Sequence, residues 1–385
     1  MKVLAVLPPS PWMEINIVAT LRRYYAANLE VFHYPGMGEL GSRQWRTQRD
    51  ELNESLLRLA RDLHSAGRLD LIFCIVYDDF LRVDTAKRLR ALNVPMVNYH
   101  IDMVFQWYRV IRSAPYFDVL AVAQSANAER LAPYNPNIEH MPMAANPDFY
   151  CQRAALLPAY QHGVSFVGSF NPHRRAWLAE CVKRGVKPVV YGQGWLDGKP
   201  TDRSFKWDLY KVAHDLRFYA VPRWRAEGIR SLTGPITRKV ARKFPLDGLA
   251  GVDYRGACDA DALPVIFRSS YVNLGFSDTG WHNKKQVLPS GMLQVRLRDF
   301  EVPMSGGFYL VQEVPEHRDY YVIGKEIETW SEPEELIDKV TFYSRSEEAA
   351  QRIREAGQKR ALENHTWRHR FDRLFVRLRS VGRLS

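Results

Sequence analysis

The feature that most constrains the fold is a series of short apolar runs that alternate with amphipathic helical stretches. Runs such as 2–7, 69–77 and 164–170 are largely apolar, and proline, glycine or polar residues bound them. Parallel strands have this pattern because helices cover both faces of their sheet. Since strands and helices alternate along most of the chain, the sequence predicts a doubly wound α/β fold.

The alternation restarts after a non-periodic stretch near 145–163, which we take as a domain junction. The chain has 385 residues, and single cores stop growing at roughly 250–300 residues. We therefore expect an N-terminal domain over 1–150, a C-terminal domain over 151–365 and a C-terminal helix over 366–385 that packs back on the first domain. Two such domains that face each other across a cleft provide a plausible small-molecule site.

Composition excludes several other classes of protein. No run of 18 apolar residues is present, so we expect no transmembrane helix, and the first residues do not form a signal peptide. The four cysteines form no C-x-x-C pair, which disfavours a zinc site or a disulfide framework and fits a cytoplasmic protein. We expect no metal.

The net charge of +11 is concentrated in one stretch. Residues 199–245 contain 12 Lys or Arg and four Asp or Glu, a difference of +8, with aromatic residues between them. We assign this basic insertion, about 199–250, to the C-terminal domain. A membrane surface, an anionic glycan and single-stranded nucleic acid all fit such a mixture, as does a solvated insertion with buried aromatics. No nucleic-acid module surrounds it, so we favour a membrane-facing or acceptor-facing insertion, with a peripheral position on the inner face of the membrane as one option.

The first candidate site follows the strand at 164–170. Gly168 and Ser169 precede a helix that Pro172 opens, and helix N-termini bind anions. Arg174 in the first helical turn opposes the helix dipole, which favours an anion site over the alternative of a solvated arginine. Tyr191 and Gly192 end the next strand and are candidates for the nucleotide base pocket.

The second candidate site lies in the segment 293–306, which we expect to be helical. Glu301 can accept two hydrogen bonds from a ribose diol, and Arg298, one turn earlier, can hold a phosphate in a bidentate manner. The alternative is an exposed ion pair between residues i and i+3, which stabilises a helix by a few tenths of a kcal/mol. Gly306 and Gly307 end this helix and lead into a strand.

Two further groups of residues follow strands. His100 and Asp102 come at the end of the strand near 94–102, and either can orient or deprotonate an acceptor hydroxyl, unless both only bond neighbouring loops. Lys284 and Lys285 lie in the loop after the strand at 271–277. They are candidates for diphosphate binding, with a solvated basic loop as the alternative.

Three segments together resemble the CgeB-like (spore maturation protein-like) glycosyltransferases, which are related to the family-4 GT-B enzymes. They are VSFVGSFNPHRRAWLAEC with VKPVVYGQGW (164–195), the segment 295–311 with its R-x-F-E-x-x-x-x-G-G-x-x-L-V-like pattern, and EAGQKRALENHTWRHR (355–370). Their order and spacing cover most of 164–370. The N-terminal half matches only loosely, around Asp102 and at 117–118.

The resemblance implies a GT-B fold with two Rossmann-like domains, an acceptor bound mainly by the first and a nucleotide-sugar donor, its nucleotide unidentified, bound mainly by the second. It implies a metal-independent reaction in which helix-end amides and basic side chains neutralise the leaving diphosphate. Glu301 matches the ribose-binding second glutamate of the E-x7-E motif. The first glutamate is replaced by Leu293, which leaves the retaining mechanism unproven.

The function that follows is transfer of a sugar to a glycan, lipid-linked or protein acceptor. Because of Leu293, a non-catalytic nucleotide- or sugar-binding protein on the same scaffold is the main alternative. A nucleic-acid-binding protein that uses the basic insertion is a weaker one.

Overall fold

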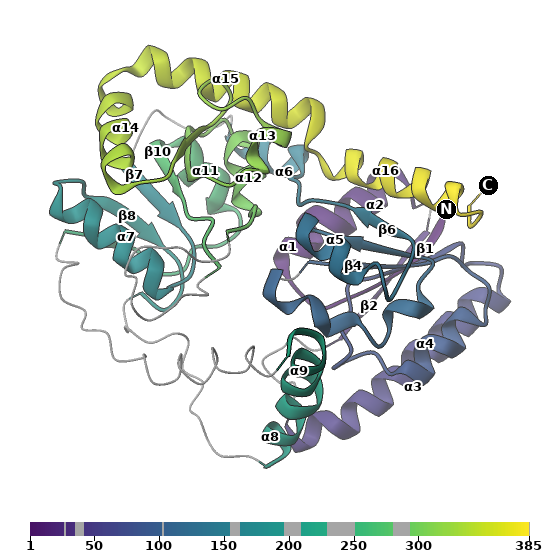
Figure 1. The fold of residues 1–385 in the computed structure, drawn as a ribbon. Coiled ribbons are helices and arrows are strands. Elements are labelled where there is room, and N and C mark those ends of the chain that lie inside the picture. The colour runs from purple at the N-terminus through teal and green to yellow at the C-terminus, as the bar shows by residue number, and fades with distance from the viewer. Residues whose placement is uncertain are drawn as a thin grey trace. The chain divides into compact units, whose positions relative to one another are not determined.

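The structure is a computed structural model, and it describes residues 1–26, 28–34, 42–101, 104–154, 162–195, 209–228, 251–279 and 293–384. The chain divides into two compact units. Unit 1 comprises Met1–Met143, Phe205–Thr233 and Trp367–Ser385, and unit 2 comprises Ala144–Ser204 and Gly234–Thr366. Each unit contains a six-stranded parallel sheet with helices around it (Figure 1), so the predicted α/β fold with two Rossmann-like domains is confirmed.

The sheet of unit 1 has the strand order β2-β1-β3-β4-β5-β6. Its strands are Lys2–Leu7 (β1), Asn28–His33 (β2), Leu71–Cys74 (β3), Met96–His100 (β4), Val119–Val122 (β5) and Ile138–His140 (β6). Its helices are Pro11–Met13 (α1), Glu14–Val18 (η1), Ala19–Tyr24 (α2), Arg43–Ser65 (α3), Val83–Arg90 (α4), Val104–Val110 (η2), Ala114–Tyr116 (η3), Ser125–Leu131 (α5), Leu209–Asp215 (α8), Leu216–Ala220 (η4), Val221–Glu227 (α9) and Trp367–Ser380 (α16).

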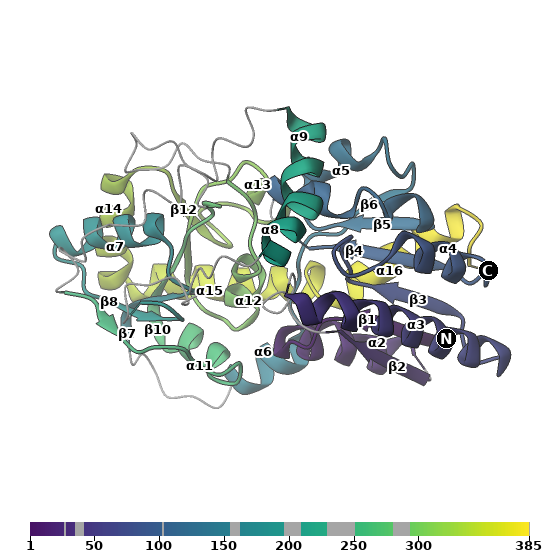
Figure 2. The same ribbon diagram turned by 90° about the horizontal axis from the view of Figure 1, so that it is seen from below.

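Helices pack on both faces of this sheet, as the apolar character of its strands requires. On one face Leu4 and Ile72 belong to a buried cluster with Leu56 of α3. On the other face Phe371 of α16 packs edge-on against Phe73 of β3, with ring centroids 5.4 Å apart. The helix α16, yellow in Figure 2, therefore completes the core of unit 1.

The sheet of unit 2 has the strand order β12-β11-β10-β7-β8-β9. Its strands are His162–Val167 (β7), Pro188–Tyr191 (β8), Asp253–Tyr254 (β9), Ser270–Gly275 (β10), Tyr309–Gln312 (β11) and Glu328–Trp330 (β12). Its helices are Pro147–Ala154 (α6), Pro172–Lys183 (α7), Ala262–Arg268 (α11), Arg298–Met304 (α12), His317–Tyr320 (α13), Pro333–Arg345 (α14) and Glu347–Asn364 (α15). Trp177 of α7 and Trp330 of β12 meet in its core with ring centroids 4.5 Å apart.

The helix α3 begins at Arg43, because the hydroxyl of Ser42 caps it by accepting a hydrogen bond from the Trp45 N–H at 3.0 Å. The start of another helix differs from the expected one. The helix α12 begins only at Arg298, whereas the expected helix begins at residue 293. Residues 293–297 are therefore not helical, contrary to the expectation.

The described part of the basic insertion is 209–228. It is helical over 209–227 and belongs to unit 1, whereas the insertion was expected to belong to the C-terminal domain. The elements α8, η4 and α9 follow one another without a break (Figure 2). The middle element, η4, is a π-helical turn, and Pro222 just after it has no N–H to continue the regular pattern. Side-chain contacts hold this helix on unit 1, and they are described with the site below.

Candidate functional site

The sheet of unit 2 reverses its strand order between β7 and β10. From β7 the chain adds β8 and β9 on one side, and it then returns to place β10, β11 and β12 on the other. Ligands of doubly wound sheets bind beyond the carboxyl ends of the strands at such a reversal. Gly168 and Ser169 follow β7 at this point, and Ser277 and Asp278 follow β10.

Gly168 and Gly192 bring the loops after β7 and β8 into backbone contact. A Cβ on Gly192, whose φ is 145°, would lie 2.1 Å from the carbonyl oxygen of Gly168. A Cβ on Gly168 would lie 2.6 Å from the ring of Phe166. The indole N–H of Trp195 donates to the same Gly168 carbonyl at 2.7 Å. Only glycine fits at either position, so the backbones of the two loops are in close contact here, next to the half-buried Tyr191.

Arg174 reaches back from the first turn of α7 to the same edge. Its Nη1 donates to the carbonyl oxygen of Ser169 at 2.8 Å, and its guanidinium lies 5.5 Å from the ring centroid of Phe166. Its Nε is buried and has no hydrogen-bond partner among the described residues. A buried N–H that is left unsatisfied costs about 1–3 kcal/mol. The side chain is therefore held in place, but part of its donor capacity is unused.

Arg174 belongs to a cluster of three guanidinium groups with Arg296 and Arg298. Burial lowers the pKa of Arg174 to about 9, and the positive charges of Arg296 and Arg298 act in the same direction. Burial also lowers the pKa of Arg296 and of Arg298. Lost solvation and mutual repulsion both disfavour three buried cations. An anion bound among them relieves both effects, so the cluster can hold a phosphate group.

Glu301 of α12 is completely buried, and both of its carboxylate oxygens have partners. The hydroxyl of Tyr150 on α6 donates to Oε1, and Nη1 of Arg298 donates to Oε2. The side chain of Glu301 has no exposed surface, whereas that of Arg298 is 29% exposed. The alternative of a solvent-exposed i,i+3 ion pair is therefore not what the structure contains. Tyr150 and Arg298 thus fix the orientation of this carboxyl group.

A second buried carboxylate, Asp299, fixes the start of α12. It accepts hydrogen bonds from the Arg296 N–H at 2.7 Å, the Tyr309 hydroxyl at 2.7 Å and Nε2 of His317 at 3.0 Å. Nδ1 of His317 accepts from the Val314 N–H, so the imidazole proton lies on Nε2 and points at Asp299. Burial and the charge of Asp299 raise the pKa of Tyr309. This network orients the segment that carries Arg296, Arg298 and Glu301.

Gly306 and Gly307 lie at the other end of α12. Gly306 has a φ of 74°, and a Cβ there would lie 2.8 Å from Nη1 of Arg268. A Cβ on Gly307 would lie 2.7 Å from the carbonyl oxygen of Phe267. Both glycines therefore allow the chain to leave α12 and enter β11 in a crowded place. The structure does not bring them together with the arginine cluster at the start of α12.

His100 ends β4 at the carboxyl edge of the sheet of unit 1. Its side chain is completely buried and meets the ring of Tyr77 edge-on, with centroids 5.9 Å apart. In this conformation no part of its imidazole is open to a substrate.

The loop after β3 carries a buried ion pair at the same edge. Nη2 of Arg109 lies 3.0 Å from Oδ2 of Asp79, and both side chains are almost fully buried. The neighbouring Asp78 accepts hydrogen bonds from Ser113 N–H and hydroxyl, yet burial raises its pKa to about 6. The guanidinium of Arg109 also lies 4.0 Å from the ring centroid of Tyr77. These charges are firmly held within unit 1.

The helix of the basic insertion packs onto this loop. The hydroxyl of Tyr219 donates to Oδ2 of Asp79 at 2.9 Å, and the indole N–H of Trp107 donates to Glu227 at 2.8 Å. The ring of Phe218 lies 5.1 Å from the guanidinium of Arg49 on α3. The insertion is thus part of the carboxyl edge of unit 1.

A family model described as "Glycosyl transferase-like" matches residues 174–375, which is more than half of the 385-residue chain. This protein belongs to that glycosyltransferase family. The match begins at Arg174 and includes the whole segment from Arg296 to Gly307. It also confirms the resemblance to CgeB-like glycosyltransferases and the expectation of a glycosyltransferase. No curated protein sequence matches the chain.

Solved structures share the fold of this glycosyltransferase at low sequence identity. Sucrose-phosphate synthase from Thermosynechococcus elongatus has a TM-score of 0.60 and 11% identity over 99% of this chain and 100% of its own. HepE from Anabaena, in complex with UDP and glucose, has a TM-score of 0.58 and 13% identity over 99% and 100%. A glycosyltransferase from Rickettsia africae has a TM-score of 0.53 and 10% identity over 100% and 99%. All three are similar to this chain in fold.

Some predicted site residues lie outside the part of the glycosyltransferase that the structure describes. They are Asp102, Lys284 and Lys285. Within the described ranges, no group of three or more His, Cys, Asp or Glu side chains is placed to hold a metal ion. Nor is any of the described helices long and apolar enough to cross a membrane.

Three residues of the site in unit 2 were not predicted from the sequence. Tyr150 lies 151 positions before its partner Glu301, so no local spacing indicates the contact. Arg296 and Asp299 stand in the same R-x-R-D-F-E segment as Arg298 and Glu301. An acidic residue at the start of a helix, next to a basic run, was the available signal for Asp299, because acidic side chains favour helix N-termini.

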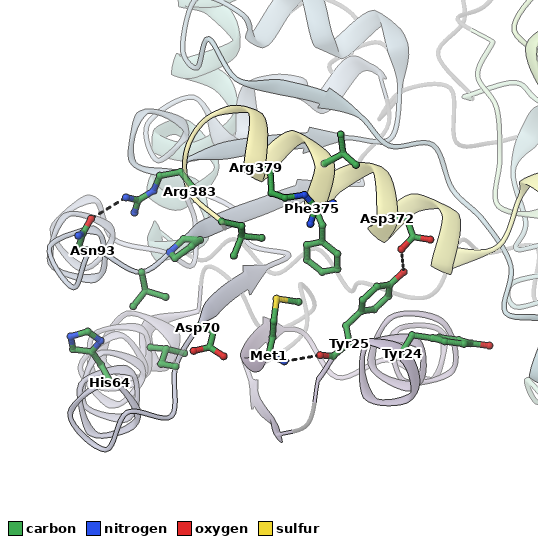
Figure 3. Close-up of a pocket in the computed structure, with 15 residues that line it drawn as sticks. Met1, Tyr24, Tyr25, His64, Asp70, Asn93, Asp372, Phe375, Arg379 and Arg383 are labelled. Atoms are coloured by element: carbon green, nitrogen blue, oxygen red, sulfur yellow. Dashed lines mark hydrogen bonds between the residues drawn. The ribbon is translucent and has the colours of Figure 1, made fainter.

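A cavity of about 950 Å³ lies elsewhere in unit 1 (Figure 3). Met1, Asp70 and Pro95, which line it, directly precede β1, β3 and β4, so the cavity is at the amino edge of the sheet. Tyr25 and Asp372 form its other side, with the Tyr25 hydroxyl donating to Asp372 at 2.7 Å. The predicted site residues among the described ones do not line it.

Proposed function

We propose that this glycosyltransferase moves a sugar from a nucleotide-sugar donor bound by unit 2 to a glycan, lipid-linked or protein acceptor. The observation that carries the proposal is the arrangement at the strand reversal of unit 2. There the buried Glu301 pairs with Arg298, which belongs to a cluster of three arginine side chains. A nucleoside diphosphate offers both the diol that such a carboxylate binds and the charge that such a cluster needs.

The donor is in our proposal a uridine diphosphate sugar, because HepE, which shares the fold, was solved with UDP-glucose. The ribose hydroxyls would donate to Glu301, which Tyr150 keeps oriented. Arg298, the exposed partner of Glu301, would then turn to the diphosphate. The diphosphate would lie against the backbone of Gly168, Ser169 and Gly192. Tyr191 would lie next to the base, and Lys284 and Lys285 near the diphosphate.

Arginine side chains are the proposed means of stabilising the leaving group. When the bond between the sugar and the diphosphate breaks, negative charge grows on the diphosphate oxygens. Arg174 and Arg296 are already positioned by hydrogen bonds to backbone carbonyls, so they need little reorganisation when that charge appears, and Arg298 joins them once the donor is bound. We therefore propose a metal-independent reaction.

The acceptor chemistry rests on the carboxyl edge of unit 1. We propose that Asp102 orients or deprotonates the acceptor hydroxyl. His100, which is completely buried two residues earlier, is the second candidate and would have to become accessible first. Retention of configuration at the transferred carbon is part of the proposal, because the resemblance to family-4 enzymes implies it. Leu293, which replaces the expected glutamate, keeps the non-catalytic binding protein as the competing function.

Binding of UDP to a Glu301→Gln variant tests the donor site. Glutamine keeps the shape but removes the charge, so we expect the dissociation constant measured by calorimetry to rise about 10-fold to 100-fold, as for the loss of hydrogen bonds to a charged group. Glu363→Gln, an exposed glutamate of α15, is the matched control and should bind UDP like the parent chain. Equal affinity in all three proteins would show that the donor site is elsewhere.

Catalysis needs a second measurement that separates the two functions. Incubation with a panel of UDP-sugars should release UDP, and anomeric analysis of the product should show retention. Tight UDP-sugar binding without release of UDP, with or without candidate acceptors, would favour the non-catalytic alternative.

A further inference from the structure

The outer face of the insertion helix, residues 209–227, is apolar although it packs on nothing described. Leu209 is 84% exposed, Leu216 52% and Trp224 47%. These exposed apolar residues recur along the helix at spacings of seven and eight, which is two turns each time, so they lie along one face. A helix needs apolar residues only where it packs, so the packing of the described residues does not explain this second apolar face.

The inner face of the same helix already anchors it. His214, Phe218 and Arg223 are buried. Tyr219 and Glu227 are hydrogen-bonded to Asp79 and Trp107 of unit 1. Because this packing holds the helix on unit 1, the outer residues are available to another surface.

Basic side chains accompany the outer apolar face. Arg217 and Arg225 each directly follow one of its apolar residues, Leu216 and Trp224, and both are exposed. The whole insertion sequence, 199–245, has an excess of eight positive charges. Such a combination of leucine, tryptophan and arginine on one face is typical of helices that lie in the headgroup region of an anionic bilayer. Leucine side chains offer no stacking surface for bases, which makes single-stranded nucleic acid a poorer fit.

We propose that the outer face of residues 209–227 binds the surface of a membrane that contains anionic lipids. Leu209, Leu216 and Trp224 enter the boundary between headgroups and acyl chains, while Arg217 and Arg225 pair with lipid phosphates. Unit 1 is then held at the lipid surface. This inference goes beyond the proposed function and does not depend on the donor site.

Co-sedimentation of the full chain with lipid vesicles tests the proposal. We expect binding to vesicles of phosphatidylcholine with phosphatidylglycerol, little binding to phosphatidylcholine alone, and a loss of binding at high salt. The variant Leu216→Ser/Trp224→Ser should bind at least about tenfold more weakly. The variant Arg217→Glu/Arg225→Glu should bind at least about 25-fold more weakly, since each basic residue near an anionic surface contributes about fivefold.

Two controls match these variants. Phe342→Ser removes an aromatic residue that is 55% exposed on α14 of unit 2. Arg58→Glu/Arg61→Glu reverses two exposed charges on α3 of unit 1. Both should bind vesicles like the parent chain.

Three results would overturn the proposal. The first is vesicle binding that both outer-face variants retain. The second is equal binding of the parent chain to vesicles of both lipid compositions. The third is a single-stranded oligonucleotide that abolishes vesicle binding of the parent chain and that the outer-face variants still bind normally. UDP affinity measured on the same preparations should be unchanged by all four variants, so a failure of the donor site is recognised separately.

Discussion

Arg174 combines a cost in stability with a role in binding. Its guanidinium is held by Ser169 and Phe166, yet one buried N–H is unpaired and two further arginines lie close by. Residues that serve binding often destabilise the free protein in this way. The same argument applies to Glu301, whose burial is tolerated because Tyr150 and Arg298 donate hydrogen bonds to its two oxygens.

Replacing Arg174 by glutamine should separate these two effects. Removal of an under-compensated cation leaves the free energy of unfolding within about 0.5 kcal/mol of the parent value or raises it. UDP should bind about tenfold or more weakly, because a charge-assisted contact to phosphate is lost. Urea unfolding and calorimetry measure the two quantities. A loss of stability above about 1 kcal/mol with unchanged UDP affinity would mean that Arg174 is structural.

At the scale of elements, the loops after β7 and β8 are set by close backbone contact. Gly192 and Gly168 allow the two loops to touch, and the indole N–H of Trp195 donates a hydrogen bond to the Gly168 carbonyl. Arg174 of α7 donates to the Ser169 carbonyl beside this contact, and Arg298 of α12 interacts electrostatically with Arg174. Strand order and helix starts, rather than one continuous motif, therefore assemble the site.

The substitution Gly192→Ala tests this contact, with Gly185→Ala as its control. Both glycines have positive φ, of 145° and 86°, but only at Gly192 would the new Cβ meet another atom within 4 Å. We expect Gly185→Ala to lower the free energy of unfolding by about 1 kcal/mol and Gly192→Ala by at least about 2 kcal/mol more, because backbone must move. Chemical denaturation of both variants gives the comparison. Equal costs would show that the loops separate easily.

At the scale of the whole molecule, each unit has its own sheet and its own core. Unit 1 is assembled from three separate segments of the chain, and unit 2 from two. The helix α16 belongs to unit 1, where Nε of Arg370 donates to the Pro142 carbonyl at 2.9 Å and Trp367 and Phe371 are buried. The stability of unit 1 thus depends on residues that follow all of unit 2 in the sequence.

Phe371→Ala should therefore weaken unit 1 selectively. Removing a fully buried phenyl ring costs about 3–5 kcal/mol. Hydrogen exchange followed by mass spectrometry should become faster in β1 and β3 but stay unchanged in β7 and β10. Phe342→Ala, at an exposed position, should change neither pair of strands. Equal acceleration in both units would show that they unfold together.

Much of the fold could be predicted from the sequence because buried parallel strands are apolar throughout. The runs at 2–7 and 69–77 contain β1 and β3, and the run at 164–170 overlaps β7. The insertion was assigned by sequence neighbourhood, whereas Tyr219 and Asp79, which are 140 residues apart, attach it to unit 1.

Residues of the candidate site could be predicted from the sequence only where they share a short segment. Arg298 and Glu301 are three positions apart, so their joint role can be inferred from helical spacing. Tyr150 and Arg174 join them from distant positions, which only the folded chain brings together. The catalytic assignments of Asp102 and His100 and the diphosphate-binding assignments of Lys284 and Lys285 stay predictions.

The three-segment construction of unit 1 has a consequence for biosynthesis. During synthesis residues 1–143 are made before unit 2 and α16 after it, so Phe73 can pack against Phe371 only once the whole of unit 2 has been synthesised. Until then, one apolar face of the first sheet lacks the helix that covers it. A chain truncated before residue 367 leaves this face open to chaperones and proteases, so cells can recognise and remove such copies.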